Sequence, residues 1–277
     1  MSKEKQVIDY YHTKESRWGY SLILGGTKHF GYYPELNQHI SMKTAMELMI
    51  DKVGEKLALP TSSMVLDAGC GEGSASIRLA QKMNFKMAGI DLLDFNIKNA
   101  NKKIDTLNLK TRVKFQVGSY MDLPFPSEYF DGVFTLETLV HAPDYNKALK
   151  EFYRILKKDG KLVLFKYSIP QNSELSEREK KVFNTIGEGS AMHSFTKFRH
   201  GDFPKILSKN GFANIEVEDI TPRIFPMLKK FSTMGFLPYQ IIKLFGQEKR
   251  FVNTTSGVEL YKYRDKFRYN IVTATKI

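Results

Sequence analysis

An apolar run that ends in alternate glycines constrains this chain more than any other stretch. Residues 64–74 read MVLDAGCGEGS, so Gly69, Gly71 and Gly73 directly follow a segment with the composition of a buried strand. A glycine turn between a strand and a helix lets a ligand approach backbone that a Cβ atom would block, and it directs the helix N-terminus at that ligand. The stretch therefore predicts an α/β fold with a nucleotide-type site at the end of a strand.

Short apolar runs alternate with amphipathic segments along the middle of the chain. The candidate strands are SMVLDAG, FKMAGID, VKFQVGS, FDGVFTLE and KLVLFKYS, and the candidate helices span about residues 41–58, 74–82, 95–107 and 145–156. Such alternation with short connections implies right-handed crossovers and a parallel sheet with helices on both faces. Two later runs, NIEVEDIT and FRYNIVTATK, bring the expected Rossmann-like, mostly parallel sheet to seven strands.

We expect residues 1–277 to form one domain, because the chain shows no internal repeat, low-complexity tract or convincing linker. Residues 1–60 would form an N-terminal helical arm and cap, and residues 61–170 the ligand-binding core. Residues 171–277 would elaborate the acceptor side, with a helical lid insertion at about 222–264. This insertion is rich in aromatic and methionine residues, which suits a lid over an apolar pocket, an interfacial segment or plain core packing.

Composition and charge limit the class of protein. With 42% hydrophobic and 26% charged residues, the chain resembles ordinary globular proteins. The N-terminal residues lack a secretion signal and no run approaches about 18 apolar residues, so we expect a cytoplasmic protein, with membrane association left open. The single cysteine, Cys70, forms no internal disulfide. A net charge of +12 favours a solvated basic surface first, contact with a phospholipid surface second and nucleic acid third.

Two acids near the glycine turn indicate the chemistry of the ligand. The spacing is G-x-G-x-G rather than G-x-G-x-x-G, and Asp67 stands two residues before Gly69. A buried acid there would repel a pyrophosphate but suits a ligand with a positive group. Asp91 ends a strand about twenty residues after the turn, where a carboxylate can accept hydrogen bonds from ribose hydroxyls. Together these residues predict a site for a nucleoside with a cationic tail.

The motifs resemble those of the class I S-adenosylmethionine (SAM) dependent methyltransferases. LDAGCGEG is similar to their first motif, GID to the second, VGSYMDLPFPSEYFDGV to the third and fourth, and LKKDGKLVLFKYS to the fifth. The resemblance covers about residues 60–170 and implies SAM as cofactor. It differs at Ser119, where many relatives carry an acid. The implied cofactor-binding residues are Asp67, Gly69, Gly71, Gly73, Asp91, Leu92, Ser119, Tyr120, Met121 and Glu137.

A finer resemblance suggests the acceptor. TLETLVHAPDYNKALKEFYRILKKDGKL and IGEGSAMHSF are similar to segments of the sterol C24-methyltransferases and the related terpenoid and tocopherol methyltransferases. It implies catalytic roles for Glu137 and His141, as base or cation stabiliser, and a helical turn would place them on one face. IDYYHTKESRWGY and KHFGYY resemble the aromatic arm of these enzymes, which lines the acceptor pocket. The expected acceptor-binding residues are Tyr11, Trp18, Tyr20, His29, Phe30, Tyr33 and His193.

These features predict methyl transfer to a small lipophilic acceptor that is sterol-, terpenoid- or prenylquinone-like. Aromatic rings support this, because their faces stabilise cations. One alternative is a methyltransferase for a polar amine, acid or phosphobase, and another is a SAM-binding or lipid-binding module without turnover. A nucleic-acid methyltransferase is disfavoured, because no N-P-P-Y or D-P-P-Y follows the fourth strand. We expect no metal site and no nucleic-acid partner; peripheral membrane contact and oligomerisation stay open.

Overall fold

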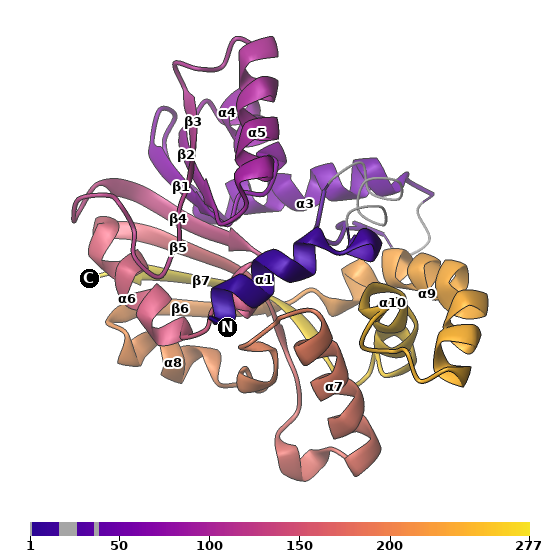
Figure 1. Cartoon of the computed structure of the whole chain (residues 1–277). Helices are drawn as coiled ribbons and strands as arrows, with labels where there is room; N and C mark the ends of the chain where they lie inside the picture. The colour runs from indigo at the N-terminus through magenta and orange to yellow at the C-terminus, as the bar shows by residue number, and fades with distance from the viewer. Residues whose placement is uncertain (1, 17–26, 36–38) are drawn as a thin grey trace.

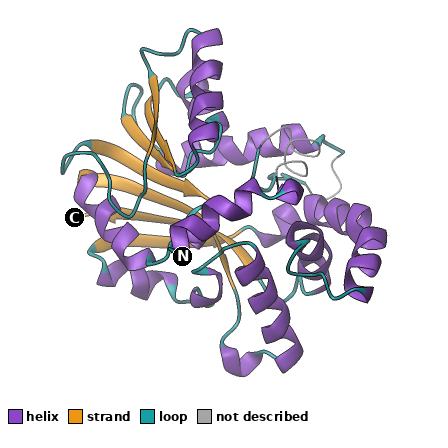
Figure 2. Ribbon diagram, in the orientation of Figure 1, coloured by secondary structure: helices purple, strands orange, loops and turns teal. Residues whose placement is uncertain are grey.

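Seven strands form one sheet in the order β3-β2-β1-β4-β5-β7-β6 (Figures 1 and 2). The computed structural model describes residues 2–16, 27–35 and 39–277. β7 runs antiparallel to β5 and β6, and the other neighbouring strands are parallel. The predicted seven-stranded, mostly parallel Rossmann-like sheet is therefore confirmed. The strands are β1 (Met64–Ala68), β2 (Lys86–Asp91), β3 (Val113–Val117), β4 (Phe130–Leu136), β5 (Leu156–Ser168), β6 (Phe212–Asp219) and β7 (Arg268–Lys276).

Helices cover both faces of this sheet, as expected. Buried residues of α3, α4 and α5 pack on one face, and those of α6 and α8 pack on the other. The four predicted helices of the core lie within one residue of the observed bounds. The helices are α1 (Lys3–His12), α3 (Met42–Leu57), α4 (Ser74–Lys82), α5 (Asp94–Thr106), α6 (Tyr145–Ile155), α7 (Glu177–Gly189), α8 (Phe203–Lys209), α9 (Thr221–Leu244) and α10 (Val252–Lys262), with 3-10 turns at Leu139–His141, Asn172–Glu174 and Phe195–Lys197.

The central position of β1 explains its apolar sequence. β1 pairs in parallel with β2 on one side and β4 on the other, and Val65, Leu66 and Ala68 are fully buried. A parallel strand covered on both faces needs apolar residues at successive positions. Because the three strands run in the same direction, the glycine turn, Asp91 and Glu137 all follow strand ends at one edge of the sheet.

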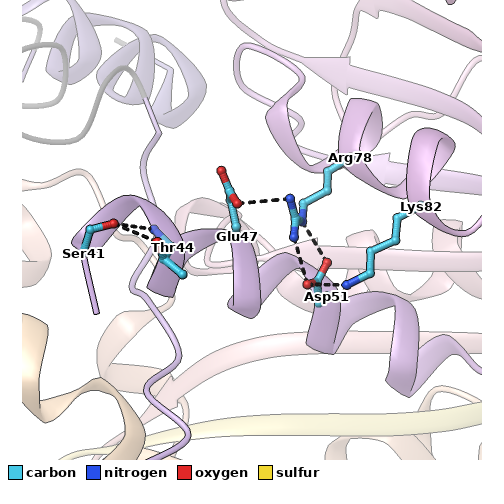
Figure 3. A network of polar contacts seen from close by, with 6 residues as sticks. All are labelled: Ser41, Thr44, Glu47, Asp51, Arg78 and Lys82. Carbon is cyan, nitrogen blue, oxygen red and sulfur yellow. Dashed lines mark hydrogen bonds and ion pairs between the residues drawn. The ribbon is translucent and has the colours of Figure 1, made fainter. Parts of the chain in front are cut away.

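A charged network fixes the cap helix α3 beside α4, the helix that the glycine turn begins (Figure 3). Arg78 of α4 makes a forked contact with Asp51 of α3, with nitrogen–oxygen distances of 2.8 and 2.9 Å. Lys82 also reaches Asp51 at 2.7 Å, and Glu47 accepts a longer bond from Arg78 at 3.2 Å. Paired guanidinium–carboxylate bonds fix orientation as well as distance. The network therefore helps to hold the middle and the end of α4 against α3.

Helices α9 and α10 come between β6 and β7 along the chain. They pack against each other, on the side of the molecule away from α5 and β3 (Figure 1). The N-terminal helix α1 meets α10, where the Tyr10 hydroxyl donates to Oδ1 of Asn253 at 2.6 Å. Among the helices of the described residues, none is both long and apolar enough to cross a membrane.

Candidate functional site

The glycine turn brings backbone to an open space at the end of β1. Gly69 has φ +97°, and a Cβ atom there would lie 2.6 Å from the Thr138 side chain. Gly71 has φ +51°, and a Cβ atom there would meet nothing within 4 Å. Both values lie in the left-handed region that favours glycine. The space beside Gly71 is therefore available to a ligand in close contact with the main chain.

Asp91 closes one side of this space. Its Oδ2 accepts a hydrogen bond from the Gly71 N–H at 2.9 Å. Its Oδ1 accepts from the Leu93 N–H at 2.9 Å and from the Asn96 side-chain amide at 3.1 Å. Burial raises the pKa of Asp91, while these hydrogen bonds act in the opposite direction. The carboxylate is thus held in a fixed orientation at the strand end, as recognition of ribose hydroxyls requires.

Asp67 is the buried acid that the sequence places before the turn. Its side chain is only 2% exposed, and Oδ2 accepts a hydrogen bond from the Ser76 hydroxyl at 2.8 Å. Burial raises its pKa to about 7. A nearby cationic group would stabilise the ionised form of this carboxyl.

These residues share one cavity at the ends of β1, β2 and β4, which we call the cofactor cavity. Asp67, Gly69, Gly71, Asp91, Leu92, Tyr120 and Glu137 all line it. Gly73, Ser119 and Met121 lie beside the cavity rather than in its wall. A Cβ atom at Gly73 would lie 2.5 Å from the Phe115 ring, which gives this glycine a packing role.

The N-terminal arm adds charged groups that the sequence analysis did not single out. The Lys28 ammonium lies 4.4 Å from the centroid of the Tyr11 ring and 3.5 Å from Oδ1 of Asn96. Burial lowers the pKa of Lys28, while Asp91 and Glu72 act in the opposite direction. Lys28 gives no signal in a sequence pattern, because it reaches the site only when the arm folds back over the sheet.

An acid from the arm, Glu4, reaches Ser119, the position where the motif itself lacks an acid. The Ser119 hydroxyl donates to Oε1 of Glu4 at 2.5 Å, and the same hydroxyl accepts from the Met121 N–H at 3.0 Å. Glu4 belongs to α1, so the carboxylate that many relatives carry at this strand end comes here from a distant segment.

Glu137 joins the arm to two strands. Tyr269 donates to its Oε1 at 2.7 Å, Tyr167 donates to its Oε2, and the Phe30 N–H donates to Oε1 at 2.7 Å. Burial raises the Glu137 pKa to about 7, against the effect of these donors. The residue has φ +63°, and the following 3-10 turn covers only Leu139–His141. Glu137 is thus outside any helix, so a helical turn does not set its position relative to His141.

Two buried histidines differ in which ring nitrogen is available. In both, Nδ1 lies close to a carbonyl oxygen, 3.1 Å from Ala191 for His141 and 2.8 Å from Phe30 for His29. A carbonyl only accepts, so Nδ1 carries the proton and Nε2 is the acceptor. Nε2 of His141 accepts from the Tyr11 hydroxyl at 3.0 Å, whereas Nε2 of His29 has no partner among the described residues. Burial lowers both pKa values to about 4, so both rings are neutral at pH 7.

A second cavity of about 390 Å³ adjoins the first, and we call it the acceptor cavity. Its wall is largely aromatic and aliphatic, with Phe195, Leu228, Phe231, Leu260 and Phe267 among its residues. Five residues line both cavities: Tyr11, Lys28, His29, Glu137 and His141. The two spaces therefore meet at the arm and at the end of β4.

The predicted acceptor-binding residues divide into three groups. Tyr11, His29 and Phe30 line the acceptor cavity. Tyr33 lines a separate groove, and Nε2 of His193 donates to the Lys3 carbonyl at 3.0 Å, so neither lies in its wall. Trp18 and Tyr20 lie outside the described residues. Tyr167 and Tyr269 were missed, because only the pairing of β5 with β7 brings them to Glu137.

Residues 61–211 match a family model described as "Methyltransferase domain", which covers more than half of the chain. The chain belongs to the SAM-dependent methyltransferase family. The S-adenosyl-L-methionine-dependent Diels-Alderase iccD of Talaromyces variabilis is 32% identical over 99% of this methyltransferase and 95% of its own length. The O-methyltransferase resE of Aspergillus sclerotiorum is 26% identical over 92% of this chain and 91% of its own.

Solved structures share the fold of this methyltransferase over its whole length. The [4+2]-cyclase SpnF superposes with a TM-score of 0.80 at 21% identity, covering 100% of this chain and 97% of its own. Geranyl diphosphate C-methyltransferase from Streptomyces coelicolor, bound to S-adenosyl-L-homocysteine, has a TM-score of 0.78 at 15% identity, covering 100% and 99%. At these identities the likeness concerns the fold.

The cofactor of this methyltransferase family is SAM, and the residues present fit it. The open space beside Gly71 admits a ligand against the backbone, and Asp91 can accept hydrogen bonds from a ribose. Asp67 lines the same cavity, and its carboxyl would suit a positive group of the ligand. These three residues are the ones from which the sequence predicts a cationic nucleoside.

Proposed function

We propose that this methyltransferase transfers a methyl group from SAM to a small lipophilic acceptor, of sterol, terpenoid or prenylquinone type. The observation that carries the proposal is the shared wall of the cofactor and acceptor cavities, formed by five residues. When bound, SAM supplies an electrophilic methyl group. Methyl transfer depends mainly on positioning the acceptor and excluding water, and two adjoining cavities, one with a largely apolar wall, suit both needs.

The wall of the acceptor cavity supports a lipophilic molecule rather than a polar amine, acid or phosphobase. Leu228, Phe231 and Phe267 offer apolar contact on one side, and Phe30 and Tyr167 offer aromatic faces on another. Three charged side chains of the described residues line this wall: the basic Lys28 and the acids Glu15 and Glu137. Glu137 is already bonded to three donors. Glu15 is likewise bonded, to the Asn253 and Thr254 N–H groups, so the surface that this wall offers to an acceptor is mainly apolar.

The proposal also assigns roles within the wall. Glu137 positions the arm and faces the acceptor cavity with a carboxyl that is half ionised near pH 7. His141 and Tyr11 form one hydrogen-bonded unit, whose hydroxyl and ring lie between the cavities. Nε2 of His29 can accept a hydrogen bond from a hydroxyl group of the molecule to be methylated. This supports O-methylation over alkylation of an unactivated carbon.

A partition assay tests the proposal. The purified protein is incubated with methyl-labelled SAM and a fractionated cell extract, and the label is then divided between organic solvent and water. Label in the organic phase supports a lipophilic acceptor and yields the product for identification. Label confined to the aqueous phase contradicts it and favours a polar acceptor.

A second candidate is a cycloaddition that uses the same cavity. The observation that favours it is the likeness to a Diels-Alderase along nearly the whole chain, rather than only along the cofactor-binding core. An apolar cavity closed by an aromatic arm can hold a flexible polyene in a folded shape, which is what a pericyclic reaction requires. In this case the product is an isomer of the substrate, and no S-adenosylhomocysteine forms. Mass spectrometry of the lipophilic products together with assay of S-adenosylhomocysteine separates the two functions.

A further inference from the structure

The second half of α9 exposes a row of large apolar side chains. Leu237, Ile241 and Leu244 are 74%, 62% and 80% exposed, and their spacing of four and three residues places them on one side of the helix. Phe245, directly after the helix, is 69% exposed. We call these four residues the apolar face. Single exposed apolar residues are common on protein surfaces, but a contiguous group marks an interaction site.

A basic groove continues this face toward the start of α9. The groove has a volume of about 1070 Å³ and is lined by Lys229, Lys230 and Arg264, with Thr233 and Met234 between them and the apolar face. Lys230 lies seven residues before Leu237, two turns away on the same side of the helix. Between residues 221 and 251 the chain has six Lys and Arg residues against the single acid Glu248. Three of the six precede Leu237 and three follow Ile241, so basic residues flank the apolar face on both sides along the chain.

The inner side of the same helix borders the acceptor cavity. Met234, Gly235 and Pro238 line that cavity, and Leu228 and Phe231 do so one to two turns earlier. Met234 lines the groove as well as the cavity. A short section of α9 thus separates the acceptor cavity from the outer surface.

We propose that α9 lies on the surface of a lipid bilayer that contains anionic lipids. The apolar face would enter the region between headgroups and acyl chains, and the basic groove would take the phosphate groups. Helices that lie in this interface combine Lys and Arg with Leu and Phe on adjoining sides. The charge of the groove is complementary to anionic headgroups, and each basic residue near such a surface adds to the attraction.

Charge also disfavours a second copy of this chain as the occupant. The whole chain carries a net charge of +12, which opposes the approach of two copies. An anionic surface instead gains from every one of these charges. The bilayer contact itself stands on the exposed face and groove alone. Its purpose, delivery of a lipophilic acceptor from the membrane past Met234, rests on the proposed function.

Vesicle sedimentation tests this contact without SAM or acceptor, so that its outcome is independent of the proposed function. The full-length protein is mixed with vesicles of phosphatidylcholine alone or of phosphatidylcholine with phosphatidylglycerol. We expect binding to the anionic vesicles that weakens as salt rises from about 0.05 to about 0.5 M. The variant Leu237→Gln/Leu244→Gln should bind at least about tenfold more weakly, because two leucine side chains no longer enter the lipid. Lys229→Gln/Lys230→Gln should remove most of the salt dependence.

The control is Leu107→Gln/Val117→Gln, which changes two exposed apolar residues beside α5 and at the end of β3, far from α9 (Figure 1). It should bind anionic vesicles as the unchanged protein does. Absence of vesicle binding, or equal binding by all variants, overturns the proposal. So does a dimer, detected by light scattering, that the α9 variants dissociate, because a second copy would then cover the face. Circular dichroism follows the unfolding of each variant. If Leu237→Gln/Leu244→Gln fails to fold, the single substitution Leu244→Gln takes its place.

Discussion

The Phe30 backbone N–H donates a hydrogen bond to Oε1 of Glu137, with nitrogen and oxygen 2.7 Å apart across 107 positions of sequence. Tyr269 donates to the same oxygen and Tyr167 to the other, so both oxygens of a buried carboxyl are engaged. One side chain therefore connects the N-terminal arm, the end of β4 and the β5–β7 pair. It also lies in the wall of both cavities. Closure of the arm and shape of the site depend on the same residue.

Replacing Glu137 should loosen the arm and reduce turnover more than cofactor affinity. Glu137→Gln turns one oxygen into an NH₂ group, which cannot accept the tyrosine bond, and the expected loss is about 1–3 kcal/mol of unfolding free energy. Denaturant unfolding measures stability, hydrogen exchange at residues 27–33 reports arm opening, and titration with SAM reports affinity. Tyr167→Phe, which removes one donor and keeps the carboxyl, is the matched control. Equal losses of affinity and turnover would instead make Glu137 a cofactor ligand.

The Asp67 and Glu137 carboxyls should contribute stability that rises as pH falls from about 7 toward 4, while His29 and His141, whose pKa values burial lowers to about 4, contribute in the opposite direction. Burial raises the pKa of Asp67 and Glu137 to about 7 in the folded protein, above their ordinary values. At these two carboxyls the folded state therefore holds more protons than the unfolded state within this window, so this contribution is fully present below the unfolded pKa and is lost as pH rises through 7. Urea unfolding at several pH values measures it. Relative to the unchanged protein, the double variant Asp67→Asn/Glu137→Gln should lose stability as pH falls from 7 toward 4, and a difference that does not change with pH would contradict the raised values.

Asp91→Ala should weaken SAM binding by about 1–3 kcal/mol, because buried ribose hydroxyls would lose their acceptor. The Gly71 N–H and the Asn96 amide also lose this partner, so the glycine turn would be held less firmly in the shape that meets the ligand. Isothermal titration calorimetry with SAM and with S-adenosylhomocysteine measures the effect, and both ligands should lose affinity alike because they share the ribose. Asp94→Ala, which removes an exposed carboxylate paired with Lys98, is the control. Unchanged affinity in Asp91→Ala would exclude the ribose contact.

The cofactor side of this site could be predicted because its residues follow strand ends within the core. The glycine turn, Asp67 and Asp91 come from two neighbouring strands whose register the parallel pairing fixes, with Asp67 opposite Gly89. Apolar runs and turn residues encode that geometry locally. The bounds of α4, Ser74–Lys82, coincide with the prediction for the same reason.

The rest of the site depends on contacts between segments far apart in sequence. Glu4 reaches Ser119 across 115 positions, and Tyr269 reaches Glu137 across 132. No local pattern marks Glu4 or Lys28, since an acid on an amphipathic arm helix and a lysine after a glycine pair are ordinary surface residues. Which of His29 and His141 keeps a ring nitrogen for a ligand depends on whether Tyr11 occupies its Nε2, and a sequence carries no sign of that. Folding of the arm onto the sheet decides both.

His29→Ala should reduce methylation of a hydroxyl acceptor about 100-fold while SAM affinity stays the same. The reason is that Nε2 of His29 is buried at the junction of the two cavities without a partner among the described residues, while Nε2 of His141 already accepts from Tyr11. Single-turnover rates with the acceptor that the partition assay identifies measure the effect. Because the His29 pKa is lowered to about 4, ionisation of this histidine should not change the methylation rate of the unchanged protein between pH 6 and 8.

The control for this prediction is His193→Ala, because His193 lies outside the acceptor cavity and bonds to the Lys3 carbonyl. It should keep nearly full activity. An acceptor methylated on an unactivated carbon needs no hydrogen-bond acceptor for a hydroxyl, so full activity of His29→Ala would argue for carbon methylation and against the assigned role.

Lys166→Met should stabilise the protein, by about 1–3 kcal/mol at pH 7. Lys166 is fully buried in β5, its Nζ has no hydrogen-bond partner among the described residues, and its ammonium lies 3.9 Å from the centroid of the Phe198 ring. Burial lowers its pKa well below the ordinary value, so the folded state holds fewer protons than the unfolded state and loses stability as pH falls below about 10.5. The advantage of Lys166→Met in thermal or urea unfolding should therefore shrink as pH rises toward 10.5. Lys158→Met, an exposed residue of the same strand, should show no such trend; a destabilised Lys166→Met would mean that the contact with Phe198 outweighs the cost of burial.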